Sequence, residues 1–231
     1  AHGASINGKQ AGSFGDISTW SFCNDKIIST LGEGGMISTN KKKLYEFCKQ
    51  QINHGTNLKN HKKTEKFIYN KDHFGTNLRI TEIQSLAGLE QLKDLKNIQR
   101  KREYISKKYF NLISKYQNYF VCFYPSKRIK SAWYRLYFFL KTDLKNYKKI
   151  RFKIIRSLRE NNLKCFTGSC PEIYLEKAFK RFKNFKPTRL NNCRILGESS
   201  IALEINHTLK YAQHKKNLLI LKNVIEKTFK L

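Results

Sequence analysis

The spacing of apolar residues predicts short strands followed by a helix in the first part of the chain. Residues 12–39 are rich in Gly, Ser and Thr and contain two β-prone runs, at 19–22 and 36–39. Next, four apolar residues recur at helical spacing: Leu44, Phe47, Cys48 and Ile52. They predict an amphipathic helix that ends near residue 54, and the polar stretch 56–72 after it is predicted to be an exposed loop.

A long helical pattern follows, and its start is marked by a capping box. Thr81 is followed three residues later by Gln84, and these two side chains can satisfy two otherwise unpaired backbone donors at a helix start. From there to about residue 116 the chain contains no proline, and its apolar residues keep a helical period. This pattern predicts one long helix, or two helices separated by a kink.

Strand and helix patterns alternate after Pro125. Residues 133–140 form a strongly β-prone run, and a second strand is predicted near residues 199–203. Two helices are predicted from apolar residues on one face: Ile150, Ile154, Ile155 and Leu158 in the first, and Leu218, Leu221, Ile225 and Phe229 in the second. The alternation favours an α/β or α+β unit.

The charge of the chain is strongly positive but scattered. The 46 Lys and Arg residues outnumber the 17 Asp and Glu residues, which gives a net charge of +29 in 231 residues. Such an excess can serve nucleic-acid binding, but that function needs clustered basic residues and a recognition motif. The lysines are spread over every segment with no such motif beside them, so they are interpreted as solvated surface, and no specific nucleic-acid partner is expected.

The six cysteines show neither paired spacing nor the His/Cys spacing of zinc sites, so no metal is expected. They are predicted to be buried thiols. Because neither a secretory leader nor an apolar run long enough for a membrane span is found, no membrane partner is expected and the cytoplasm is predicted as the compartment. The chain opens on Ala1, and its one methionine is Met36 within a predicted strand, so we expect it to be the later part of a longer protein.

One lysine stands in an unusual setting, in the stretch SFCNDKIISTLGEGG. Lys26 falls on the connection between the two β-prone runs, after Ser21 and before three glycines. A lysine that acts as a nucleophile must be neutral and placed close to a carbonyl, typically that of an aldehyde cofactor with which it forms a Schiff base. The serine hydroxyl could bind a phosphate, and the glycines could let a bulky ring approach the backbone. The stretch is not a nucleotide-binding Walker loop, because that spacing is absent.

Several motifs together resemble the signature of one enzyme family. They are Gly12–Asp16 (GSFGD), Ser21-Phe22, Lys26, Gly32–Gly35 (GEGG), Asn53-His54-Gly55, Gly75–Gln84 (GTNLRITEIQ) and Leu86–Leu89 (LAGL). With these motifs the chain resembles the DegT/DnrJ/EryC1/StrS aminotransferases, which are pyridoxal-phosphate enzymes of fold type I that aminate nucleotide-linked keto sugars. The resemblance covers essentially the whole chain, and it is more specific in the first hundred residues than later.

The resemblance implies a fold and a domain organisation. The fold would be α/β, the fold type I of pyridoxal-phosphate-dependent aminotransferases. Residues 1–120 would form the C-terminal part of the large cofactor-binding domain, with a mixed sheet, and would end in a long connecting helix. Residues 121–231 would form the smaller C-terminal α/β domain.

The resemblance also implies the cofactor, the site residues and the partners. Lys26 would bind pyridoxal 5'-phosphate as a Schiff base and act as the catalytic residue, while Ser21 would help hold the phosphate. Asn77 would reach the phosphate in the neighbouring subunit, which requires a homodimer. The substrate would be a nucleotide-diphosphate keto sugar, with glutamate as the amino donor, in polysaccharide or amino-sugar biosynthesis.

Some of the family's residues would fall before Ala1, among them the aspartate that pairs with the pyridine nitrogen of the cofactor. Residues 1–231 alone are therefore expected to be a poor catalyst or inactive. Two other interpretations stay open. One is a sugar dehydratase of the same fold, although those relatives typically carry histidine in place of the lysine. The other is a noncatalytic remnant or basic binding module.

Overall fold

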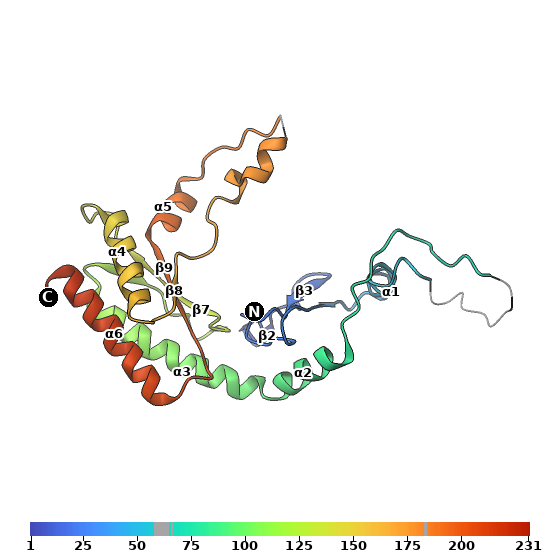
Figure 1. Cartoon of the computed structure of the whole chain (residues 1–231), viewed down its shortest axis with the longest axis horizontal. Coiled ribbons are helices and arrows are strands. Elements are labelled where there is room, and N and C mark those ends of the chain that lie inside the picture. Colours follow the sequence, from blue (N-terminus) through green and yellow to red (C-terminus); the bar gives the residue numbers. More distant parts are fainter. Residues whose placement is uncertain (58–64, 66, 183) are drawn as a thin grey trace. The chain divides into compact units, whose positions relative to one another are not determined.

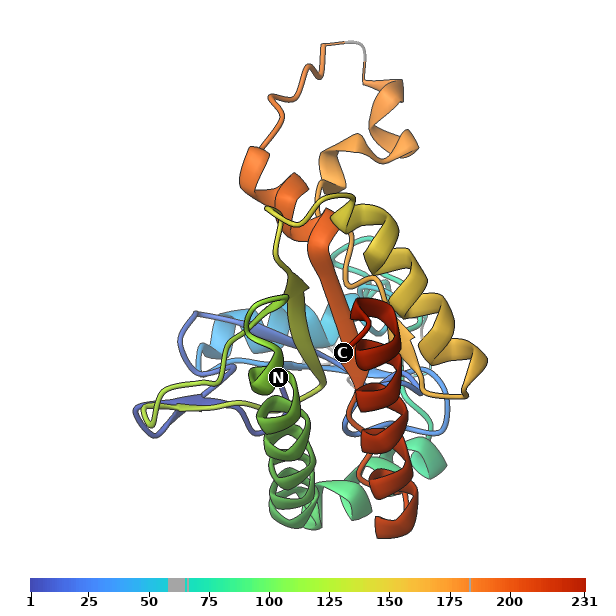
Figure 2. The same ribbon diagram turned by 90° about the vertical axis from the view of Figure 1, so that its left-hand side faces the viewer.

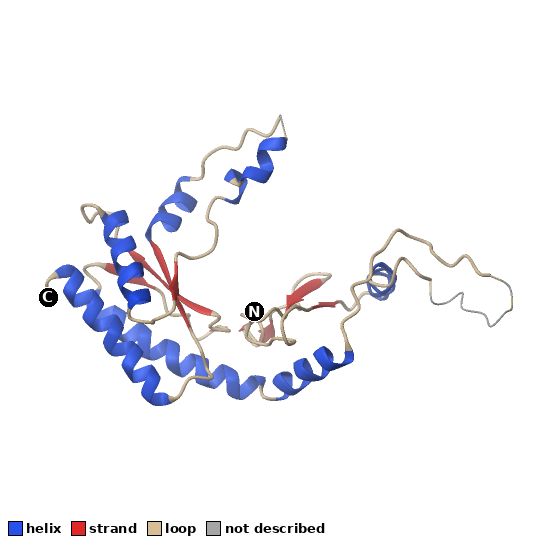
Figure 3. Ribbon diagram, viewed as in Figure 1, coloured by secondary structure: helices blue, strands red, loops and turns tan. Residues whose placement is uncertain are grey.

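The computed structural model describes residues 1–57, 65, 67–182 and 184–231 of the chain, and these form two compact units. The N-terminal unit consists of residues 1–99 and 126–132, and the C-terminal unit consists of residues 100–125 and 133–231. The division predicted at residue 120, into a large and a small domain, stays a prediction about the complete protein. Figure 3 shows the helices and strands that make up each unit.

The N-terminal unit contains five short strands. β1 (Ser5–Ile6) lies between β2 (Lys9–Gln10) and β6 (Ile129–Lys130), and β3 (Ser18–Ser21) pairs with β4 (Gly35–Ser38). The two β-prone runs predicted from the sequence are therefore confirmed as a strand pair. All these pairs are antiparallel, and a mixed sheet stays a prediction for the complete large domain. The strand β6 is supplied by residues 126–132, which return to this unit after the chain has entered the other.

The predicted helices of this part of the chain are confirmed. α1 spans Lys42–Gln51, and the long helical pattern forms two helices, α2 (Glu82–Lys93) and α3 (Leu95–Ile113), which are separated at Asp94 (Figure 1). The capping box is present, because the Thr81 side chain accepts a hydrogen bond from the backbone N–H of Gln84 and the Gln84 side chain accepts one from the backbone N–H of Thr81. Residues 58–64 and 66 of the predicted loop 56–72 lie outside the described residues.

Two glycines of the N-terminal unit allow two backbone segments to touch. Gly55 adopts a left-handed φ of +69°, and a Cβ atom there would lie 1.6 Å from the carbonyl oxygen of His73. A Cβ atom at Gly75 would lie 2.4 Å from the backbone nitrogen of Gly55. The backbone of Asp72 donates a hydrogen bond to the Gly55 carbonyl oxygen at 3.0 Å, which holds the two segments together. Both positions therefore require the absence of a side chain.

We expect Gly55→Ala to lower the free energy of unfolding by about 2 kcal/mol or more, because alanine is strained at this φ and its methyl group would displace the segment at His73. Urea denaturation followed by circular dichroism measures the change. Gly15→Ala is the matched control, since the nearest atom to its added Cβ would be at an ordinary 3.7 Å. Equal stability of the two variants would contradict the expectation.

The C-terminal unit is built on a four-stranded antiparallel sheet. Its strands are β5 (Phe120–Cys122), β7 (Arg135–Leu140), β9 (Ser200–Glu204) and β8 (Cys165–Phe166), in that order across the sheet. Along β7 buried and half-buried residues alternate, as expected for a strand with one face on the core. The two strands predicted in this part of the chain, at 133–140 and 199–203, are confirmed by β7 and β9.

Helices cover one face of this sheet. α4 (Tyr147–Glu160), α6 (Tyr211–Phe229) and α3 lie on the same side of the strands in Figures 1 and 2, and the shorter α5 (Asn191–Ser199) leads into β9. One apolar core joins these helices to the sheet; its fully buried members include Ile113, Phe138, Ile154, Leu158, Ile201, Leu221 and Ile225. An antiparallel sheet with its helices on one face is an α+β arrangement, one of the two left open by the sequence.

A buried arginine connects α3 to two loops of the C-terminal unit. Arg102 is 5% exposed, and its guanidinium donates hydrogen bonds to the carbonyl oxygens of Trp133, at 2.9 and 3.1 Å, and Tyr134, at 3.0 Å. A further nitrogen lies 3.1 Å from Nδ1 of His207. Burial lowers the pKa of Arg102 to about 10, so the side chain is still charged at neutral pH. The hydrogen bonds to these protein acceptors replace the bonds to water that the charged guanidinium loses on burial.

The cysteines only partly follow their prediction. All six are free thiols, but Cys165 is the one that is buried, Cys170 is exposed, and the other four are half-buried. The prediction of buried thiols is therefore wrong for most of them. Among the residues that the structure describes, no helix is both long and apolar enough to cross a membrane.

Candidate active site around Lys26

Lys26 lies on the connection between β3 and β4, where the sequence places it. Its amine forms an ion pair with Asp25, with Nζ 2.7 Å from Oδ1. The same carboxylate oxygen accepts a hydrogen bond from the thiol of Cys23 at 3.0 Å, and the Ser21 hydroxyl donates to that sulfur at 3.5 Å. A continuous polar chain therefore links the two residues that the resemblance assigns to the cofactor. The Lys26 side chain is 29% exposed, so a small molecule can reach it.

The backbone around Lys26 is fixed from both sides. The Lys26 N–H donates to the carbonyl oxygen of Cys23 at 3.0 Å, and that of Thr30 donates to Phe22 at the same distance. Ile27 and Ile28, which follow the lysine directly, are each 3% exposed. Their burial anchors the turn in the N-terminal unit, so the amine is held on a rigid element as a catalytic group requires.

His2 joins the two ends of this turn. Its Nδ1 accepts a hydrogen bond from the Ile28 backbone at 3.3 Å, and its ring is also hydrogen-bonded to the backbone of Ser21. The ring stacks on Trp20 with a centroid distance of 5.7 Å. Because Nδ1 acts as an acceptor, we assign the proton of the neutral ring to Nε2. His2 therefore has a structural role beside Lys26, as a packing residue that joins the two ends of the turn.

The stability of the 231-residue chain is expected to fall in acid because of His2. Burial, together with the charges of the amino end and Lys26, lowers the pKa of His2 from 6.5 to about 4. Because the pKa is lower in the folded state, the neutral His2 ring contributes to the free energy of unfolding. This contribution is complete above pH 6.5 and is lost as the pH falls towards 4, by about 2–3 kcal/mol in total. Urea denaturation at several pH values gives the free energy of unfolding as a function of pH. This free energy should fall less steeply with decreasing pH in His2→Gln than in the unchanged chain. An identical slope would contradict the assignment.

Two of the glycines after Lys26 make room for other atoms of the protein. A Cβ atom at Gly34 would lie 2.1 Å from Oγ1 of Thr30, and one at Gly35 would lie 2.9 Å from the carbonyl oxygen of Trp20. Gly32 has a left-handed φ of +134° and no atom within 4 Å of such a Cβ. The idea that all these glycines admit a cofactor ring is therefore corrected, because protein atoms already occupy the space beside two of them.

Asn77 lies in a separate polar cluster of the N-terminal unit. It forms an isolated antiparallel bridge with Asn53, and its side-chain oxygen accepts a hydrogen bond from the Arg79 backbone at 3.3 Å. The Arg79 guanidinium in turn donates to the side chain of Asn53. The cluster orders the segment before α2. Its role towards a phosphate in a neighbouring subunit stays a prediction.

The residues around Lys26 fit a cofactor that carries an aldehyde and a phosphate. The accessible amine, in its neutral form, can react with a carbonyl, and the adjacent carboxylate of Asp25 orients it through their ion pair. Ser21, at the end of β3, is exposed and offers a hydroxyl donor to an anion. Sequence reasoning missed Asp25 and Cys23 as members of this site, although both stand within the quoted motif.

The sequence matches the model of the DegT/DnrJ/EryC1/StrS aminotransferase family over residues 1–218. The chain belongs to this family. The predicted resemblance is thus confirmed, and with it the reaction class of the family, amino transfer, and the family's cofactor, pyridoxal phosphate.

Curated relatives of this family are similar over different shares of the chain. A GDP-perosamine synthase of Escherichia coli O157:H7 is 44% identical over 104 residues, which is 45% of this chain and 26% of the relative. The UDP-4-amino-4,6-dideoxy-N-acetyl-beta-L-altrosamine transaminase of Helicobacter pylori is 28% identical over 214 residues, which is 93% of this chain and 54% of the relative. The chain thus spans about half the length, or less, of these relatives.

Solved structures confirm the predicted fold class. An aminotransferase from Psychrobacter cryohalolentis superposes with a TM-score of 0.90 at 31% identity, over 99% of this chain and 60% of that one. PseC of Helicobacter pylori is described as an aminotransferase involved in the biosynthesis of pseudoaminic acid. It superposes with a TM-score of 0.83 at 24% identity, over 98% of this chain and 58% of that one. The latter likeness concerns the fold alone.

Proposed function

We propose that this chain carries the reactive lysine of an aminotransferase that moves an amino group from glutamate to a nucleotide-linked keto sugar. The observation that carries the proposal is the polar chain from Ser21 through Cys23 and Asp25 to the amine of Lys26. It puts an amine, the carboxylate that is paired with it and a hydroxyl donor on one anchored turn. Membership of the family supplies the reaction class.

Each residue of the turn has a distinct task in this proposal. Pyridoxal phosphate, when bound, supplies the aldehyde that accepts the amino group and a ring that takes up an electron pair. Lys26 would hold the cofactor through its amine, which reacts with an aldehyde only in its neutral form, and Asp25 would orient that amine through their ion pair. The same amine, when free, would move a proton at the substrate carbon. Ser21 donates its hydroxyl hydrogen bond to the phosphate.

The partners follow from the relatives and from the resemblance. The names of the relatives contain GDP- and UDP-linked amino sugars, which supports a nucleotide-diphosphate keto sugar as the substrate and a role in polysaccharide biosynthesis. Asn77 would contact the phosphate of a second subunit, and the enzyme would therefore act as a homodimer. The free thiols suit a reducing cytoplasm.

The proposal is tested with the complete reading frame that contains this chain. The purified protein is incubated with pyridoxal phosphate, glutamate and either a GDP-linked or a UDP-linked 4-keto sugar, and mass spectrometry detects the amino sugar together with 2-oxoglutarate. We expect both products with at least one of the two sugars, and little of either from residues 1–231 alone. Formation of 2-oxoglutarate without a sugar amine, or of neither product, would overturn the proposed substrate class.

A further inference from the structure

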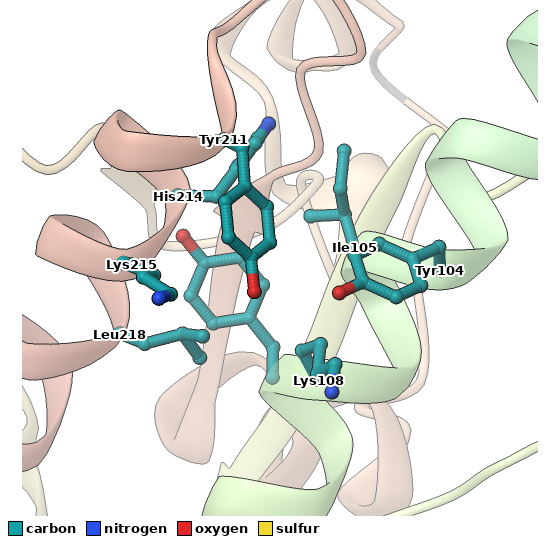
Figure 4. A pocket seen from close by; sticks show the side chains of 8 residues that line it. Tyr104, Ile105, Lys108, Tyr211, His214, Lys215 and Leu218 are labelled. Atoms are coloured by element: carbon teal, nitrogen blue, oxygen red, sulfur yellow. The ribbon is translucent and has the colours of Figure 1, made fainter.

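A cavity lies within the C-terminal unit and shares no lining residue with the Lys26 site. It has a volume of about 240 Å³ and is lined by side chains of α3 and of the first two turns of α6. Figure 4 shows these side chains converging from the two helices. Ile105 and Leu218 supply apolar surface to its wall. The cavity is smaller than the roughly 300–1,000 Å³ typical of sites for drug-sized ligands, so it suits a single ring system.

The two helices present the same pair of residues to this cavity. Tyr104 and Lys108 stand one helical turn apart on α3, and Tyr211 and Lys215 stand one turn apart on α6. In each pair the lysine Nζ lies near the face of the tyrosine ring, at 5.3 Å from the centroid on α3 and 5.0 Å on α6. The tyrosines are 47% and 58% exposed, so their rings are accessible.

The charge of the cavity has one sign. Two lysines line it, and none of the described residues that line it is acidic. Aromatic faces favour stacking with another ring, while paired ammonium groups favour an anion. A ligand that combines both features would match the lining better than a purely apolar or a purely anionic molecule.

The inner wall contains a polar atom that lacks a partner. The His214 ring is hydrogen-bonded to the backbone of Leu209, while its buried Nδ1 has no partner of good hydrogen-bond geometry among the described residues. Burial lowers the pKa of His214, so its ring is neutral at pH 7. Buried polar atoms are normally hydrogen-bonded, and an orphaned one at a cavity wall indicates that something else supplies the partner. Tyr109 also lines the cavity, and it is 3% exposed.

We propose that this cavity binds a flat aromatic or heteroaromatic anion. Its ring stacks against Tyr104 and Tyr211, its carboxylate or phosphate lies between the lysine ammonium groups, and a ring heteroatom forms a hydrogen bond with His214. The proposed site is separate from the Lys26 site, because the two have no residue in common, and the proposal does not rest on the amino-transfer function. It would serve as a place where a metabolite regulates or stabilises the protein.

Two probes distinguish the source of the anionic group. Indole-3-acetate provides an aromatic carboxylate and uridine 5'-monophosphate provides a heteroaromatic phosphate, while indole and inorganic phosphate provide the separate halves. Binding to the 231-residue chain is measured by isothermal titration calorimetry, and NMR follows the ring signals of His214. We expect at least one complete probe to bind about tenfold more tightly than either half and to shift the His214 signals.

Charge-matched variants test the position of the site. Lys108→Gln combined with Lys215→Gln should weaken binding of the complete probe about tenfold or more, whereas Lys107→Gln combined with Lys222→Gln should leave it unchanged. Both pairs remove two charges from the same helices, but Lys107 and Lys222 do not line the cavity. Tyr211→Leu should weaken binding by loss of stacking, and circular dichroism checks that every variant is folded. Equal affinity in the two double variants, or no binding of either probe, would overturn the proposal.

Discussion

Lys26→Ala is expected to abolish amino transfer by the complete enzyme and to remove the visible absorbance of lysine-bound pyridoxal phosphate. The variant loses both the amine that binds the cofactor and the base that moves a proton at the substrate carbon. A positioned acid or base alone contributes about 10²–10⁴-fold to a rate, so we expect the rate to fall about 10³-fold or more. Stopped assays of 2-oxoglutarate formation and a visible spectrum measure the two effects.

Lys41 provides a close control for this substitution. Its amine also forms an ion pair with a carboxylate at 2.7 Å, that of Asp16, but its side chain is 59% exposed. Lys41→Ala removes the same charge from the same unit and should retain the absorbance and nearly the full rate. Surface pairs of this kind contribute little to stability, so both variants should remain folded. If Lys26→Ala behaved like Lys41→Ala, the proposed role of Lys26 would be wrong.

Arg102→Met should destabilise the C-terminal unit by about 3–5 kcal/mol. Methionine fills part of the same volume but removes the hydrogen bonds that the guanidinium donates to the carbonyl oxygens of Trp133 and Tyr134 and to His207. The loss of hydrogen bonds to a charged group costs more than the loss of neutral ones, and here three acceptors are affected together. The midpoint of urea denaturation, followed by circular dichroism, measures the change.

Arg156 is the reference for this second prediction. It lies on α4 in the same unit, its side chain is 83% exposed, and it pairs with Glu160 at 2.8 Å on the helix surface. We expect Arg156→Met to change the free energy of unfolding by less than about 0.5 kcal/mol. A similar small change in Arg102→Met would show that the buried guanidinium is not needed to hold the two loops on α3.

The sequence predicted features that depend on neighbouring residues. Thr81 and Gln84 form their capping box because both partners lie within one helical turn, and β7 was recognisable from its continuous run of β-prone residues. The position of Lys26 between two strands followed from local turn signals for the same reason. The break at Asp94 was left open, because helical periodicity continues across it and no proline or glycine marks it.

Features that depend on distant contacts could not be read in this way. His2 reaches Ile28 across 26 positions, and Tyr104 lines the same cavity as Tyr211, more than a hundred positions later. No periodicity or motif encodes such encounters, since they arise only when whole elements pack. The role of Gly34 was misjudged for a related reason: the motif showed a missing side chain, but only the fold shows that Thr30 fills the space.

The return of residues 126–132 to the N-terminal unit has a consequence for how this protein can be made and divided. The polypeptide passes between the two units three times, after Gln99, Pro125 and Ala132. A ribosome must therefore synthesise all of α3 and β5 before β6 exists to complete the edge of β1. No single cut of the gene separates the units intact, and a product ending at residue 99 would expose an unpaired strand edge that invites aggregation.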